Sequence, residues 1–188
     1  RALDETAHLL GLAAPPRVIE SYDISNWGDG TSVAGMVVFE DGKPKKAGYR
    51  RFKMHTVPGT DDYASMAETL ARRAAEYEKG TNSQFKIKPD LLLIDGGRGQ
   101  VAAVCAALAG TRLAGVPVFG MVKDDRHRTR ALVDPAGGEI GIQQIPAVFA
   151  LVGRIQEETH RFAIEFQRLQ QSKQVRGSVL DRIPGVGE

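Results

Sequence analysis

The chain has 188 residues, of which 42% are hydrophobic and 26% charged; this composition indicates one globular domain and excludes a chain disordered throughout. No apolar run approaches the roughly 20 residues of a membrane-crossing helix, so we expect no membrane partner. A single cysteine, Cys105, excludes an internal disulfide and predicts a reducing, cytoplasmic location. The formal net charge of +2 is too small to indicate a nucleic-acid partner by itself.

The first third of the chain predicts a β-meander after a short leader. Residues 1–16 form the leader, which contains a short helical stretch. Residues 17–24 and 33–39 are rich in β-branched and aromatic side chains, and the Asp-Gly turn at 41–42 favours a hairpin. Residues 47–54 alternate and return antiparallel, so three strands are expected here.

The middle of the chain changes to a β-α-β order. Apolar residues at helical spacing predict a helix over 60–79, and the unbroken apolar run at 91–94 is typical of a central strand covered on both faces. A second helix is expected over 100–109 and a further buried strand over 116–121. Because a helix separates these strands, we expect them to be parallel neighbours.

The last third predicts a small hairpin and one long helix. Residues 131–133 and 139–142 bracket a turn. Pro146 then opens a helix whose apolar stripe continues to Leu169, for about six turns. Beyond Lys173 the sequence is polar.

The basic residues are grouped along the chain. Six lie between Lys43 and Lys53 without an acid among them, four more lie between Lys123 and Arg130, and a third group follows Arg161. Such clusters on a nearly neutral chain are consistent with a face that binds a polyanion. Lysine and arginine side chains that merely solvate the surface are the alternative.

Two predicted strands each carry one carboxylate near their C-terminal end, Asp23 and Asp95. An antiparallel meander, a helix and then a parallel strand is an order that places the first and fourth strands side by side, so the two acids meet at one sheet edge. Two such charges about 5 Å apart repel by about 3 kcal/mol at an effective dielectric constant of 20. A divalent cation would remove this repulsion, and oxygen ligands favour Mg²⁺ or Mn²⁺. Taken singly, Asp23 also fits a strand-end residue and Asp95 a cap of the next helix.

The long helix carries a histidine beside its apolar face. Thr159 and Phe162 belong to the apolar stripe, so His160 lies next to it, one turn after Glu157. An imidazole there can bind a metal ion or transfer a proton near neutral pH. A surface histidine paired with Glu157 is the alternative.

Further candidates lie at the ends of other elements. Lys123 comes just past a parallel strand, where α/β sheets bind ligands; it can hold a phosphate or be solvated. Asp61 and Asp62 open the first long helix. Because adjacent helical side chains point about 100° apart, at most one of these two acids faces a cleft.

Five short blocks stand out along the chain. They are Tyr22-Asp23-Ile24-Ser25, Tyr49-Arg50-Arg51-Phe52, Asp61-Asp62-Tyr63-Ala64-Ser65-Met66, Leu93-Ile94-Asp95-Gly96-Gly97-Arg98-Gly99-Gln100 and Glu158-Thr159-His160-Arg161-Phe162-Ala163-Ile164. In this order and spacing the blocks resemble UvrC, the family of nuclease subunits of bacterial nucleotide excision repair. The resemblance covers the chain from about residue 17 to its end.

The resemblance implies an α/β, ribonuclease-H-like mixed sheet, an antiparallel meander plus parallel strands, flanked by helices. It implies a metal-dependent DNA endonuclease that makes the incision on the 5′ side of a lesion. The family's two aspartates and one histidine carry over to Asp23, Asp95 and His160, which would hold Mg²⁺ or Mn²⁺, with Asp62 as a further acidic position. The cations expected to hold DNA phosphates are Arg50, Arg51, Lys53, Lys123, Arg126 and Arg161.

The resemblance also implies a division of the chain. We expect a leader at 1–16, the endonuclease domain at 17–175, and at 176–188 the start of a truncated helix-hairpin-helix module. Because the chain begins at Arg1, we expect it to be cut from a longer protein. The implied partners are damaged double-stranded DNA and UvrB, the latter through a segment outside this chain.

Two other functions stay open from the sequence. One is a catalytically silent DNA- or protein-binding module on the same fold, against which the intact acids and histidine argue. The other is a ribonuclease that cuts RNA–DNA hybrids. No feature of the sequence reads a 2′-hydroxyl, so only a comparison of substrates separates this activity from DNA cleavage.

Overall fold

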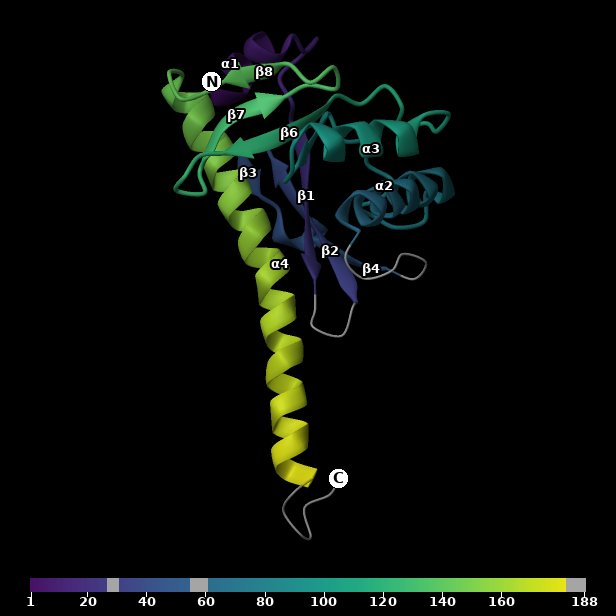
Figure 1. Cartoon of the computed structure of the whole chain (residues 1–188). Coiled ribbons are helices and arrows are strands. Elements are labelled where there is room, and N and C mark those ends of the chain that lie inside the picture. The colour runs from purple at the N-terminus through teal and green to yellow at the C-terminus, as the bar shows by residue number, and fades with distance from the viewer. Residues whose placement is uncertain (27–30, 55–60, 182–188) are drawn as a thin grey trace.

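The computed structural model describes residues 1–26, 31–54 and 61–181, and shows a mixed β-sheet with helices on both faces (Figure 1). The strand order is β3-β2-β1-β5-β6-β7-β8, and β4 also pairs with β2. This arrangement confirms the predicted fold class. In the described ranges, no helix combines the length and the apolar character that a bilayer crossing requires.

The meander forms one half of the sheet. β1 (Val18–Asn26) pairs antiparallel with β2 (Ser32–Glu40), which pairs antiparallel with β4 (Arg50–Lys53). The single return strand predicted over 47–54 is wrong in detail. A short β3 (Lys43–Pro44) and a 3₁₀ turn, η1 (Lys46–Gly48), precede β4. Gly48 is buried at this break, where a Cβ would lie 2.6 Å from Oε1 of Gln84, so a larger residue here would force the Gln84 side chain to move.

The crossovers form the other half. α2 (Asp62–Lys79) leads to β5 (Leu91–Ile94), and α3 (Arg98–Leu108) leads to β6 (Val118–Lys123). β5 pairs in parallel with both β1 and β6, as the sequence predicts. The small hairpin β7 (Thr129–Val133) and β8 (Glu139–Gly141) closes this end of the sheet.

Two hydrophobic clusters hold the layers together. One lies between the sheet and the pair α2 and α3; the other lies between the sheet and α4 (Pro146–Asp181). Leu3 and Leu9 of α1 (Ala2–Leu10) pack against the second cluster, so the predicted leader contributes to the same core. Burial of these apolar side chains is the main source of stability.

α4 is longer than the six turns that the sequence predicts. It continues to Asp181 and extends well beyond the sheet (Figure 1). Residues 176–181, expected to begin a helix-hairpin-helix module, are the last turns of this helix, and the expected hairpin at 183–187 lies outside the described residues. The boundary at 175 stays a prediction.

A buried ion pair joins β1 to α2. Nε and Nη2 of Arg73 donate to the two carboxylate oxygens of Glu20 at 3.0 and 2.8 Å, and both side chains are fully buried. The Tyr22 hydroxyl donates to Glu20 at 2.6 Å, and Arg73 also donates to the carbonyls of Phe85 and Ile87, each at 2.7 Å. Because these partners satisfy the charges, the pair fixes α2 and the following loop on β1.

Glu20→Gln tests this pair. The substitution leaves the Arg73 charge buried without its counter-ion, so we expect a loss of about 3–5 kcal/mol in the free energy of unfolding, measured by urea denaturation. The exposed Glu78→Gln in α2 is the matched control, with an expected change below about 0.5 kcal/mol. Equal stability of the two variants would contradict the assignment.

Candidate metal centre

The pairing of β1 with β5 brings two carboxylates to one sheet edge. Asp23 lies in β1, and Asp95 directly follows β5. Tyr22 and Ile94 are aligned in the parallel register, and the Asp95 amide donates to the Tyr22 carbonyl at 2.9 Å. The adjacency of first and fourth strands is thereby confirmed. The side chains of Asp23 and Asp95 are largely covered, with exposed fractions of 15% and 5%.

A glycine in β6 leaves room for the loop that follows Asp95. A Cβ at Gly120 of β6 would lie 2.3 Å from the Gly96 carbonyl oxygen, so the loop crosses β6 in direct backbone contact. Gly97 is the N-cap residue of α3, and no side chain forms a capping hydrogen bond there. Asp95 therefore does not serve as the cap that its Asp-Gly-Gly sequence also allowed, and its carboxylate faces the sheet edge.

Helix α4 delivers the histidine. The hydroxyls of Thr159 and Ser21 hydrogen-bond at 2.9 Å, which ties α4 to β1 two residues before Asp23. Gly35, the cross-strand partner of Asp23, leaves room for the Phe162 ring, since a Cβ there would lie 3.0 Å from Cδ2 of Phe162. With α4 held at this distance, Nδ1 of His160 lies 3.4 Å from Oδ2 of Asp23.

The three side chains form a group with the spacing of a metal site. Ligand atoms of Asp23, Asp95 and His160 all lie within 4.8 Å of one another. Two ligands of one Mg²⁺ ion lie at most about 4.2 Å apart, given bonds of about 2.1 Å, so a small contraction would let all three bind one ion. The donor set, two carboxylates and one imidazole, fits Mg²⁺ or Mn²⁺.

The acid pair is under electrostatic strain without a bound metal ion. Burial raises the pKa of Asp23 to about 8, and the nearby charge of Asp95 adds to this rise, while Lys123 opposes it. Lys123 contacts the other acid directly, with Nζ 2.9 Å from Oδ1 and 3.1 Å from Oδ2 of Asp95. The sequence placed Lys123 at this edge but missed its contact with Asp95. Topology gave only their common edge, because Lys123 ends β6 and Asp95 directly follows the neighbouring parallel strand β5.

The structure separates Asp61 from Asp62. Asp61 is the N-cap of α2 and accepts the Ala64 amide at 3.0 Å. Oδ1 of Asp62 accepts a hydrogen bond from Asn26, the last residue of β1, also at 3.0 Å. Asp62 thus faces the strand that carries Asp23, although it is not part of the group of three.

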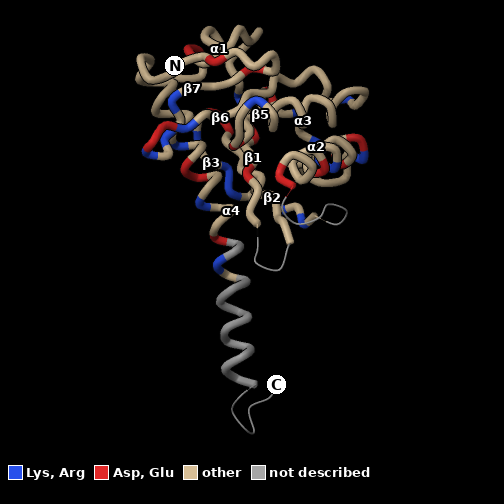
Figure 2. Tube along the Cα trace, viewed as in Figure 1, with Lys and Arg blue, Asp and Glu red and all other residues tan. Residues whose placement is uncertain are grey.

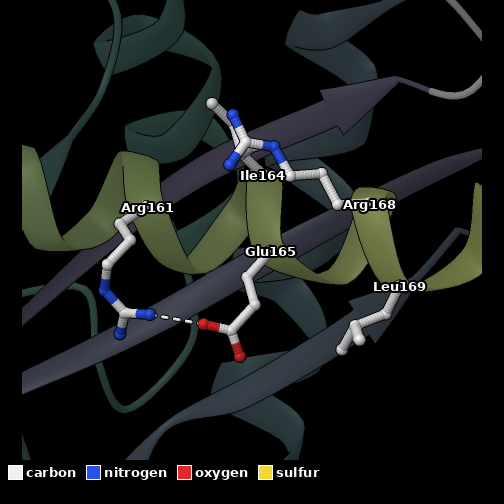
Figure 3. A pocket seen from close by; sticks show the side chains of 5 residues that line it. All are labelled: Arg161, Ile164, Glu165, Arg168 and Leu169. Atoms are coloured by element: carbon white, nitrogen blue, oxygen red, sulfur yellow. Dashed lines mark hydrogen bonds and ion pairs between the residues drawn. The ribbon is translucent and has the colours of Figure 1, made fainter. Parts of the chain in front are cut away.

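Most of the six cations predicted to hold DNA already have partners within the chain. Arg50 donates to Asn82 and to two carbonyls, Arg51 stacks on Phe162 at 3.8 Å, and Lys123 contacts Asp95. Arg161 pairs with Glu158 and Glu165 on α4, and Figure 3 shows it with Glu165, Ile164, Arg168 and Leu169 around one shallow hollow. Lys53 and Arg126 are exposed. Along the described trace, basic and acidic residues are interspersed (Figure 2).

The mixed sheet with helices on both faces has the ribonuclease-H-like fold. A solved structure with this architecture, the crystal structure of human ENDOV, matches with a TM-score of 0.51 at 11% identity, covering 83% of this chain and 86% of that chain. At this identity the match shows the fold alone.

Sequence comparison then defines the family. Residues 7–164 match the family described as the UvrC RNAse H endonuclease domain, and the chain belongs to this family of DNA-repair nuclease domains. UvrABC system protein C of Alkaliphilus oremlandii is 46% identical over 200 residues, and that of Thermoanaerobacter pseudethanolicus 48% over 195. These alignments cover 99% and 98% of this chain but 31% of each relative, so the chain spans about a third of their length. The resemblance found in the sequence is confirmed.

The raised pKa of Asp23 predicts a pH-dependent stability. The carboxyl ionises near 3.8 in the unfolded chain but keeps its proton to about pH 8 in the metal-free fold. Between these values the folded state binds the additional proton, so its stability falls as the pH rises, by at most about 1.4 kcal/mol per pH unit, and the fall ends above pH 8.

Asp23→Asn isolates this effect. With EDTA present, urea unfolding at pH 6 and pH 8 should show the unsubstituted protein losing about 2 kcal/mol more than Asp23→Asn over this interval. Parallel pH profiles of the two proteins would show that the Asp23 carboxyl is not held protonated.

Proposed function

We propose that this domain makes the 5′ incision of bacterial nucleotide excision repair by metal-dependent hydrolysis of a DNA phosphodiester. The observation that carries the proposal is the convergence of Asp23, Asp95 and His160, which come from three different elements, in a member of the UvrC endonuclease family. Two buried acids beside one imidazole destabilise the metal-free fold, and such a cost is typical of a functional site. The substrate is damaged double-stranded DNA, and the setting is the bacterial cytoplasm.

The cofactor of the proposal is Mg²⁺ or Mn²⁺, held by Asp23, Asp95 and His160. When bound, the ion supplies Lewis-acid stabilisation of the charge on the phosphate that is cut. Asp23 and Asp95 would hold the ion at the sheet edge, because Asp23 lies in β1 and Asp95 directly follows β5, the parallel neighbour of β1. His160 completes the site as a ligand or as the group that moves a proton, since its side chain is 52% exposed and DNA can reach it.

Other residues act around this centre. We assign Asp62 to positioning, because its hydrogen bond to Asn26 holds the end of β1 that carries Asp23. The six predicted cations would hold backbone phosphates, which carry no sequence information and suit an enzyme that cuts beside any lesion. UvrB is the proposed protein partner, through a segment outside this chain.

Asp95→Asn in the full-length protein tests the proposal. It keeps the side-chain shape but removes a ligand charge, so we expect 5′ incision of a damaged duplex to fall at least about 100-fold. The 3′ incision made by the same full-length protein is the internal control, and Asp41→Asn in an exposed turn is the matched variant. Survival of 5′ incision at the unsubstituted rate, with an intact fold, would disprove the site.

Metal binding should stabilise this chain. Mn²⁺ at about 100 times its dissociation constant raises the free energy of unfolding by about 2.7 kcal/mol when it binds only the folded state. We expect the melting temperature to rise with Mn²⁺ for the unsubstituted protein and to stay constant for Asp95→Asn, as measured by calorimetry. An equal rise in both proteins would place the binding elsewhere.

A further inference from the structure

Lys123 is held against the acid pair itself. Its Nζ lies 2.9 and 3.1 Å from the two oxygens of Asp95, and its side chain is only 29% exposed. A residue that merely waits for a phosphate would extend into solvent, whereas this ammonium spans both oxygens of a buried carboxylate. One side of Asp95 is therefore already occupied by a cation of the chain.

The local backbone supports this contact. The pairing of β6 with β7 shifts its register between Val122 and Lys123. Such irregularities re-aim a side chain and are common beside active sites. The adjacent acid does not compete for the ammonium, because Asp124 accepts the amides of Arg126 and Arg128 at 2.8 and 3.0 Å and organises the hairpin turn.

The sum of the charges at the site indicates what the contact between Lys123 and Asp95 does. Two carboxylates, one ammonium and one divalent ion leave the site with a single positive charge, which matches the single negative charge of a phosphodiester. A second divalent ion would leave three positive charges within a few ångströms, in a site that is largely buried. Lys123 thus makes a second ion unfavourable.

We propose that Lys123 takes the place of a second divalent ion, so that the acid pair binds one metal ion. This inference rests on the proposed function and deepens it. The flexible stem of lysine and its three N–H donors allow Nζ to contact Asp95 and a non-bridging phosphate oxygen together. The ammonium would then meet the negative charge that develops on the phosphate.

The test is Mn²⁺ binding to Lys123→Met, a substitution of similar length without charge. Titration calorimetry of this chain, with electron paramagnetic resonance to count bound ions, should show one Mn²⁺ in the unsubstituted protein. In Lys123→Met the first ion should bind at least about tenfold more tightly and a second ion should appear, because the repelling charge is gone. In the full-length protein, 5′ incision should nevertheless fall at least about tenfold.

Two further variants sharpen the result. Lys123→Arg keeps the positive charge and should keep a single ion, and Lys123→Gln replaces Lys123→Met if that variant does not fold. The control is Lys88→Met, an exposed lysine at the opposite end of β5, which should bind Mn²⁺ as the unsubstituted protein does.

The outcomes separate the two proposals. If Lys123→Met binds the same number of ions with the same affinity, or if the unsubstituted protein binds two ions, the role of Lys123 is wrong. The metal site itself survives either result as long as Asp95→Asn loses Mn²⁺. If Asp95→Asn binds Mn²⁺ like the unsubstituted protein, the proposed function fails as well.

Discussion

The parallel pairing of β1 with β5 is the constraint on which this structure depends. It fixes Asp23 and Asp95 at one sheet edge, where burial and mutual repulsion raise the pKa of Asp23 to about 8. The two strands cannot separate to relieve the repulsion, because both contribute side chains to the buried core: Ile19 from β1, and Leu91 and Leu93 from β5. The hydrophobic core thus maintains an arrangement that electrostatics alone would oppose, which is the usual condition of a preorganised site.

The two faces of β1 place their acidic side chains in different electrostatic environments. On the α2 face, Glu20 meets Arg73 and every charge has a partner. On the α4 face, Asp23 meets another acid, and the nearby charge of Lys123 lowers the pKa of Asp23 only in part. Glu20 and Asp23 are three positions apart, an odd number, so the alternation of side chains along a strand places them on opposite faces of the sheet. The satisfied face therefore anchors the strand, and the unsatisfied face is left for a ligand.

Much of this arrangement could be predicted from the sequence, because apolar periodicity reports which face of an element is buried. The run at 91–94 became β5 with the predicted bounds, and its place beside β1 followed from topology. Contacts between side chains of different elements could not be predicted in this way. Gly48 packs against Gln84 in a 3₁₀ turn that interrupts a predicted strand, and the Lys123–Asp95 contact comes next to a register shift that has no periodic signature. The length of α4 was underestimated because its end carries no apolar stripe to report burial.

Several cations near the metal site already have partners within the chain, so they add little to the affinity for DNA. Arg161 pairs with two glutamates and Arg51 stacks on Phe162, so a phosphate that binds these residues must share donors already in use. A site that carries one net positive charge with its metal ion neutralises the phosphodiester it cuts but adds little attraction for the neighbouring phosphates. Since counter-ion release scales with the number of phosphates neutralised, strong DNA binding needs more contacts than Lys53 and Arg126 provide. In the proposed reaction, the described residues of this chain therefore supply a metal site with few exposed cations beside it.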